Sequence, residues 1–238
     1  MMKMNESRIR AICWLLGLFA LISPSLVRYA RAQIRESLPA ESNHPSKSDQ
    51  TAVMAGGCFW GVDGVFKHVK GVTGVTSGYS GGSQKTAEYE TVSTGTTGHA
   101  ESVMITYDPS KISYSQLLKI FFLVAHDPTE LNRQGPDVGS QYRSIIFYDN
   151  DEQKKLAQNY IAELNKSKVW ANPIVTEVVA LKQFYPAEEY HQNFLERNPD
   201  YPYIVYNDLP KLDELRKQFP SLYNPSPILK DEVNGRVK

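Results

Sequence analysis

Residues 51–61 read TAVMAGGCFWG, and this stretch decides the expected fold. Its first five residues are mostly apolar, which is typical of a short buried strand. Gly56 and Gly57 then end the strand and allow the backbone to turn sharply. Residues 59–69 have the pattern of a helix. The stretch therefore predicts a strand, a tight turn and a helix, with Cys58 at the turn.

The segments that follow alternate between strand and helix patterns. Strands are predicted at residues 72–79, 102–107, 142–148 and 174–181. Helices are predicted at residues 113–125, 151–166, 187–197 and 209–219. Ser113 and Gln116 have the spacing of a capping box at the start of the first of these helices. The alternation predicts a single domain of the α/β (α+β) class, a two-layer sheet-and-helix sandwich with a mixed sheet.

The chain divides into four expected parts. Residues 1–32 have the features of a signal peptide, and residues 33–50, rich in Ser, Pro and Asn, form a flexible leader. Residues 51–198 form the folded domain. Residues 199–238 are expected to be a long, irregular C-terminal segment that wraps the domain surface, since six prolines lie between positions 199 and 227.

The first 32 residues predict export. Three basic residues precede the apolar run 11–22, and Ala30-Arg31-Ala32 gives a cleavage site before Gln33. We therefore expect a periplasmic or secreted protein. If this segment is kept, residues 11–27 would instead anchor the chain in a membrane, although Pro24 and the short apolar run count against that alternative.

The composition is that of a globular protein. Of the 238 residues, 41% are hydrophobic and 22% are charged, enough for a packed core. Lys+Arg and Asp+Glu are both 26, so no basic excess indicates binding to nucleic acid. Cleavage would remove Cys13 and leave Cys58 as the one cysteine. In an oxidising compartment a single thiol is a liability unless it is buried or used.

The position of Cys58 predicts a reactive thiol. The first turn of a helix offers unpaired backbone N–H groups and the positive end of the helix dipole, and both favour the thiolate. The alternative is a structural cysteine packed by Phe59 and Trp60. Position alone leaves both readings open.

The hexapeptide at residues 56–61, GGCFWG, resembles the signature of the A-class peptide methionine sulfoxide reductases. Further blocks of the chain resemble that family in the same order: 78–82 (GYSGG), Tyr89, 97–101 (TGHAE), 107–109 (YDP), 126–128 (HDP), 133–139 (RQGPDVG), 141–144 (QYRS) and 188–192 (EEYHQ). The resemblance covers residues 52–198, and it implies a ferredoxin-like arrangement for this domain and a catalytic role for it.

The resemblance also implies roles for single residues. Cys58 would be the nucleophile that attacks the sulfoxide sulfur and ends as a sulfenic acid. Glu101 would be the acid, and its place between Ala100 and Ser102 at a strand is compatible with a buried carboxyl whose pKa is raised. Tyr89 and Tyr142 would hold the sulfoxide oxygen by hydrogen bonds.

Four further residues match family positions around the pocket. Phe59 and Trp60 would form the wall that receives the S-methyl group. Asp137 matches the active-site aspartate of the family. His191 matches a position near the pocket, where a surface or capping histidine is nearly as good an interpretation. We read His99 as structural.

The resemblance implies reduction of methionine-S-sulfoxide, free or in damaged proteins. Electrons come from thiols, so neither a metal nor a nucleotide cofactor is expected, and the histidines have no metal-ligand spacing with Cys58. The chain departs from many family members after Asn198, where it has no further cysteine. An external reductant is therefore needed, either a small thiol or a thioredoxin-like protein. We expect a monomer.

Two alternatives stay open at this point. A cysteine hydrolase could use Cys58 with His191, which follows it by 133 positions, although the Cys-Gly-x-Cys-Trp pattern of papain-type proteases is missing. A non-catalytic exported binding domain would hold an inert Cys58 and use its aromatic residues as a peptide-binding patch.

Overall fold

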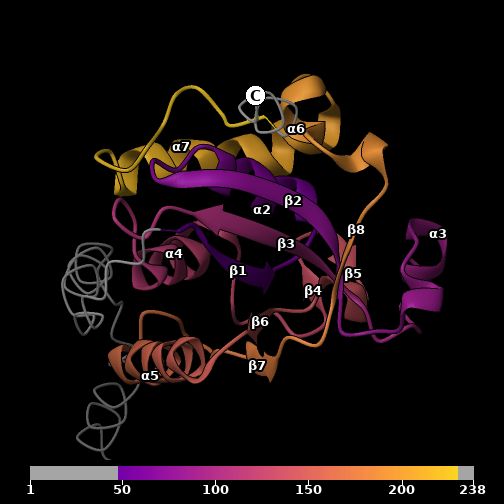
Figure 1. Cartoon of the computed structure of the whole chain (residues 1–238), viewed down its shortest axis with the longest axis horizontal. Helices are drawn as coiled ribbons and strands as arrows, with labels where there is room; N and C mark the ends of the chain where they lie inside the picture. The colour runs from indigo at the N-terminus through magenta and orange to yellow at the C-terminus, as the bar shows by residue number, and fades with distance from the viewer. Residues whose placement is uncertain (1–47, 230–238) are drawn as a thin grey trace, which may run out of the picture. The chain divides into compact units, whose positions relative to one another are not determined.

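A six-stranded sheet organises residues 48–229, the part of the chain that the computed structural model describes (Figure 1). In spatial order its strands are β7 (Glu177–Ala180), β6 (Ile145–Tyr148), β1 (Gln50–Ala55), β3 (Ala100–Tyr107), β2 (Val72–Ser80) and β8 (Phe184–Pro186). Strands β6 and β7 are parallel, and the other neighbours are antiparallel. The mixed sheet predicted from the sequence is therefore confirmed.

Helices pack on this sheet. Four of them are α2 (Phe59–Lys67), α4 (Tyr114–Ile120), α5 (Asp151–Ser167) and α7 (Leu209–Gln218). Helix α2 packs on β2 and β3, and α7 runs beside α2 (Figure 1). Helix α5 packs on β6 and β7 and touches α4. The α7 helix confirms the helix predicted after residue 208.

Shorter elements complete the fold. Helices α3 (Tyr89–Val92) and α6 (Phe194–Arg197) are single turns, and β4 (Arg133–Gln134) with β5 (Asp137–Val138) forms a separate hairpin. The remaining elements are 3₁₀ turns at Gln84–Thr86, Ser140–Tyr142 and Glu189–His191, and π-helical turns at Phe121–Ala125 and Ile204–Asp208. The ferredoxin-like arrangement stays a prediction.

Local sequence accounts for the start of α4. The Ser113 hydroxyl accepts the Gln116 N–H at 3.2 Å, and the Gln116 side chain accepts the Ser113 N–H at 3.0 Å. Two N–H groups that a helix start leaves unpaired are thereby satisfied, a device that contributes about 1 kcal/mol for each cap. The helix predicted at 113–125 is confirmed, with its second half wound as the π-helical turn.

The turn between β1 and α2 requires its two glycines. Gly57 has a φ of +89°, a left-handed conformation that favours glycine. A Cβ atom on Gly57 would lie 2.5 Å from the Gln134 side chain, and one on Gly56 would lie 2.9 Å from the His126 ring. The glycines thus let the hairpin loop and His126 approach closely, and this packing fixes the position of Cys58.

One predicted helix is wrong. Residues 187–197 form a 3₁₀ turn and the short α6, separated at Asn193, whose φ of 54° is left-handed. The Asn193 side chain accepts a 2.7 Å hydrogen bond from the buried Lys67 ammonium, which also pairs with Asp63. This buried anchor holds a conformation that a continuous helix does not allow.

Several predicted strand ends also differ. Strand β7 begins three residues later than predicted, and β6 begins at Ile145 because Tyr142 belongs to a 3₁₀ turn. Strand β2 continues to Ser80, and Gln50, assigned to the leader, is the first residue of β1. The predicted signal peptide and the leader up to residue 47 lie outside the described residues. Within residues 48–229, no helix is long and apolar enough to cross a membrane.

Candidate active site

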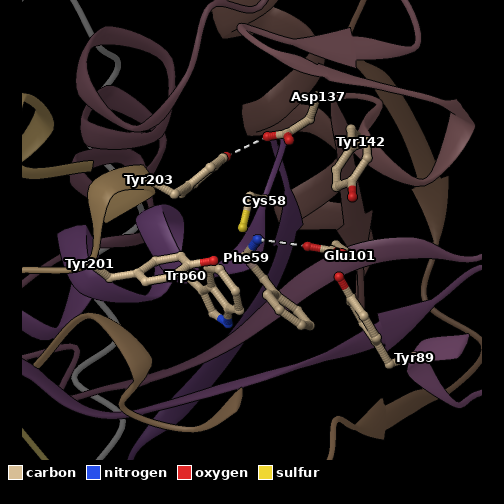
Figure 2. A pocket seen from close by; sticks show the side chains of 9 residues that line it. All are labelled: Cys58, Phe59, Trp60, Tyr89, Glu101, Asp137, Tyr142, Tyr201 and Tyr203. Carbon is tan, nitrogen blue, oxygen red and sulfur yellow. Dashed lines mark hydrogen bonds between the residues drawn. The ribbon is translucent and has the colours of Figure 1, made fainter. Parts of the chain in front are cut away.

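A pocket of about 210 Å³ lies at the start of α2 (Figure 2). It gathers side chains from α2, α3, β3, the β4–β5 hairpin, a 3₁₀ turn and the C-terminal segment. Its lining residues are Cys58, Phe59, Trp60, Tyr89, Glu101, Asp137, Tyr142, Tyr201 and Tyr203. The first seven are among the eight candidate residues chosen from the sequence, so the structure brings all of them but His191 together in one place.

Cys58 occupies the N-cap position of α2, directly before the first helical turn in which it was predicted. The residue is 9% exposed and lines the pocket, so a substrate reaches the sulfur through the pocket. A hydrogen bond from the Trp60 main-chain N–H lowers the pKa of the thiol, which is the helix-start effect expected from the sequence.

The net effect on Cys58 is nevertheless opposite to the prediction. Burial raises the pKa of the thiol well above its ordinary value, and the charges of Glu101, Asp208 and Asp137 raise it further. These effects outweigh that of the Trp60 N–H. The helix start therefore does not lower the pKa of this thiol as expected, and Cys58 carries its proton at neutral pH.

Glu101 is a neutral carboxylic acid at neutral pH, as predicted. This residue of β3 is 2% exposed, and burial raises the pKa of its carboxyl to about 8. Its Oε2 accepts the Phe59 main-chain N–H at 3.0 Å, so the proton of the neutral form resides on Oε1. The acid is thereby oriented by the residue that follows Cys58, and the charge that would raise the pKa of Cys58 is largely absent at pH 7.

Two tyrosine hydroxyls accompany this acid. Figure 2 shows the hydroxyls of Tyr89 and Tyr142 pointing toward Glu101. Burial raises the pKa of each phenol, with the Glu101 charge as the next cause, so both are neutral hydrogen-bond donors at physiological pH. Three neutral O–H groups therefore converge on one side of the pocket.

Aromatic rings form the other side. The Trp60 ring stacks on Phe194 with centroids 3.7 Å apart and planes 7° apart, and its edge meets Tyr201 and Tyr203. The Trp60 indole N–H donates to Nδ1 of His191 at 3.2 Å. His191 is thus behind this wall, holding Trp60, and it is absent from the residues that line the pocket.

Comparisons with known proteins agree on one family. A family model described as peptide methionine sulfoxide reductase matches residues 50–222. A relative from Mesorhizobium japonicum, named peptide methionine sulfoxide reductase MsrA 2, is 63% identical over 180 residues, covering 76% of this chain and 92% of the relative. The chain belongs to this family. A Synechocystis relative of the same name is 53% identical over 174 residues, covering 73% of this chain and 81% of the relative.

Two related proteins of solved structure have the same fold as this reductase. Mxr1 of Saccharomyces cerevisiae in reduced form has a TM-score of 0.61 at 33% identity, covering 69% of this chain and 94% of that one. Methionine sulfoxide reductase A of Corynebacterium diphtheriae has a TM-score of 0.57 at 30% identity, covering 68% and 84%. The mixed α/β fold is therefore shared with these two proteins.

Two pocket residues of the reductase were not predicted from the sequence. Tyr201 and Tyr203 line the pocket from the segment that was expected only to wrap the surface. The Tyr203 hydroxyl donates to Asp137 on the β4–β5 hairpin, which ties the C-terminal segment across the pocket (Figure 2). The Tyr-Pro-Tyr sequence at 201–203 was the available signal, because tyrosine rings with a polar hydroxyl are enriched at binding surfaces.

A second carboxyl also faces the start of α2. Asp208 is fully buried, and its Oδ1 pairs with Lys211 at 3.1 Å. A Cβ atom on Gly61 would lie 2.1 Å from this oxygen, so only glycine lets the ion pair approach α2 so closely. Within residues 48–229, no group of three His, Cys, Asp or Glu side chains is arranged to hold a metal ion.

Proposed function

We propose that this chain reduces methionine-S-sulfoxide to methionine, with Cys58 as nucleophile and Glu101 as acid. One observation carries the proposal: the only cysteine of the described residues and a carboxyl with a pKa of about 8 open into one pocket with an aromatic wall. Sulfoxide reduction by a thiol needs each of these parts, a nucleophile, a proton donor and an apolar site for the methyl group.

The first half-reaction moves one oxygen. The Oε1–H of Glu101 hydrogen-bonds to the sulfoxide oxygen, and the sulfur of Cys58 attacks the sulfoxide sulfur as the thiol gives up its proton. The sulfoxide S–O bond breaks, and the oxygen ends on Cys58. Thiol and sulfoxide become sulfenic acid and thioether, so no net proton or electron is exchanged with solvent.

The two sides of the pocket orient the substrate. The hydroxyls of Tyr89 and Tyr142 hold the oxygen beside Glu101, where negative charge develops as the S–O bond weakens. The methyl group packs against Phe59 and Trp60. With oxygen and methyl placed on different sides, the third substituent leads to the pocket mouth in only one epimer, which gives the site its selectivity.

The second half-reaction uses thiols from outside the chain. One external thiol attacks the Cys58 sulfur and releases water, and a second thiol resolves the mixed disulfide and restores Cys58. We propose a thioredoxin-like protein as the donor, because one such partner supplies both thiols. A small thiol such as dithiothreitol serves in the assay.

The alternatives have no support in the geometry. A hydrolase would need His191 as a base beside Cys58, but Nδ1 of His191 accepts the Trp60 indole N–H and its ring faces Glu188. A binding domain would not need a buried acid beside a thiol. Both alternatives would predict no loss of methionine sulfoxide in the assay below.

Steady-state turnover with dithiothreitol tests the proposal. We expect methionine from the S epimer only, and no methionine from a Cys58→Ser variant, since its hydroxyl cannot form the sulfenic acid. A Cys58→Ser variant as active as the unmodified protein would overturn the proposal. Equal rates with both epimers would overturn the proposed orientation of the substrate.

Export remains part of the proposal. The basic start, apolar run and Ala30-Arg31-Ala32 of residues 1–32 support cleavage before Gln33 and a role in repairing oxidised proteins of the cell envelope. The mass and N-terminal sequence of the protein recovered from the producing cell test it. A chain that still begins at Met1 and stays in the cytoplasm would contradict export.

A further inference from the structure

Tyr89 belongs to α3, a helix too short to be stable on its own. It is the first residue of α3, a helix of only four residues, Tyr89–Val92. Helices this short are unstable in isolation, and their first N–H groups lack partners within the helix. The Glu88 side chain that precedes it accepts the Thr91 hydroxyl at 2.7 Å. The position of Tyr89 therefore depends on an anchor outside α3.

Glu188 supplies that anchor from a distant part of the chain. Its Oε1 accepts the Tyr89 main-chain N–H at 2.8 Å, and its Oε2 accepts the Tyr79 hydroxyl at 2.8 Å. Tyr79 belongs to β2 in the sheet and is fully buried, so it is a rigid support. One carboxylate thus ties the start of α3 to the sheet.

The charge of Glu188 is suited to this contact. Burial alone would raise its pKa, but hydrogen bonds, above all those from the Tyr89 N–H and the Tyr79 hydroxyl, favour the carboxylate, and the pKa lies below its ordinary value. The carboxylate is therefore ionised at neutral pH and accepts both bonds, and charge-assisted bonds of this kind are about twice as strong as neutral ones.

His191 encloses Tyr89 from the same segment. Its ring lies 4.6 Å from the Tyr89 ring, centroid to centroid, and its Nε2 lies 4.0 Å from Oε2 of Glu188. Because Nδ1 accepts the Trp60 indole N–H, the proton of the neutral ring is on Nε2 and points to the carboxylate side. The segment at 188–191 therefore holds both the main chain and the ring of Tyr89.

From these contacts we infer that Glu188 is the positioning residue for Tyr89 in sulfoxide reduction. It fixes the first N–H of α3 to the sheet and so keeps the Tyr89 hydroxyl aimed at the substrate oxygen beside Glu101. Glu188 itself does not line the pocket. The inference rests on the proposed function, in which the Tyr89 hydroxyl binds the sulfoxide oxygen.

Two substitutions at Glu188 separate geometry from charge. In Glu188→Ala the Tyr89 N–H loses its acceptor, and we expect kcat with a methionine-S-sulfoxide peptide and dithiothreitol to fall about 10- to 100-fold, since misplacement by about 1 Å can cost that much. In Glu188→Gln the amide oxygen accepts the Tyr89 N–H, and the amide N–H donates to Tyr79, whose hydroxyl can also accept. We expect this variant to stay within about threefold of the unmodified protein.

A double-variant cycle identifies the route of the effect. If Glu188 acts through the Tyr89 hydroxyl, Glu188→Ala lowers kcat little further in a Tyr89→Phe background, because that hydroxyl is already gone. Glu90→Gln is the matched control: it removes an exposed carboxylate next to Tyr89 and should leave kcat unchanged.

Either of two results would overturn the inference: an unchanged kcat in Glu188→Ala, or a double variant whose loss equals the product of the two single losses. Both results presuppose an active unmodified protein. An unmodified protein that forms no methionine would instead overturn the proposed function, so the two failures are distinguishable.

Discussion

Replacing Glu101 by Gln should make the protein more stable at alkaline pH and much less active. The carboxyl is buried, and burial raises its pKa from the ordinary value of 4.5 to about 8. The folded protein therefore binds a proton that the unfolded chain releases above pH 4.5. The stability that this proton contributes is fully present below pH 4.5. It is lost as the pH rises toward 8, because the carboxyl ionises more easily in the unfolded chain.

The size of this loss follows from the two pKa values. At about 1.4 kcal/mol for each pH unit between 4.5 and 8, the loss is on the order of 5 kcal/mol. The amide in the Glu101→Gln variant stays neutral at every pH, and its oxygen can still accept the Phe59 N–H. The free energy of unfolding of this variant, relative to that of the unmodified protein, should therefore rise by several kcal/mol as the pH is raised from 4.5 to 8.5.

Urea unfolding at the two pH values measures this difference. Glu90→Gln, at an exposed carboxylate, controls for the loss of a charge as such. If the stability of Glu101→Gln relative to the unmodified protein does not depend on pH, Glu101 does not hold a proton in the folded state. In the same variant, turnover should fall by roughly 10²–10⁴ because an amide cannot act as the acid, and unimpaired turnover would refute that role.

Three further predictions follow from the contacts of the site and of α2. Alkylation of Cys58 by iodoacetamide should have a pH midpoint above the ~8.5 of a free thiol and a lower one in Glu101→Gln, and a midpoint below 7 would contradict the buried thiol. Tyr89→Phe and Tyr142→Phe should each slow methionine formation by about 10- to 100-fold, whereas a double variant with full activity would exclude the hydroxyls from binding the oxygen. Lys67→Met should lower the free energy of unfolding by about 3–5 kcal/mol, since it leaves the buried carboxylate of Asp63 without its ion-pair partner. An unchanged urea midpoint would contradict this.

Local pattern sufficed for most of the fold. The strand, glycine turn and helix at 51–67 could be predicted because each depends on neighbouring residues, and the capping box at Ser113 is a local signal of the same kind. The helix predicted at 187–197 failed because Asn193 takes its left-handed conformation from a hydrogen bond to Lys67, more than a hundred residues away. Such distant anchors leave no periodic signal in the sequence.

The site could be predicted in its members but not in its electrostatics. Cys58 and Glu101 were chosen from the motifs, and both line the pocket. The position of Cys58 at a helix start predicted a low pKa, but burial and the nearby Asp208, 150 positions later, reverse that effect. Tyr203 was missed for a similar reason, since its hydrogen bond to Asp137 exists only once the C-terminal segment packs across the pocket.

The stoichiometry of a single turnover tests whether Cys58 takes the sulfoxide oxygen. The purified protein, free of reductant, is mixed with each epimer of methionine sulfoxide, and methionine is counted while a sulfenic acid reagent traps Cys58. Reduction through Cys58 predicts about one methionine per protein from the S epimer, none from the R epimer, and a matching amount of trapped sulfenic acid on Cys58. No methionine from either epimer, with Cys58 still a thiol, would contradict it.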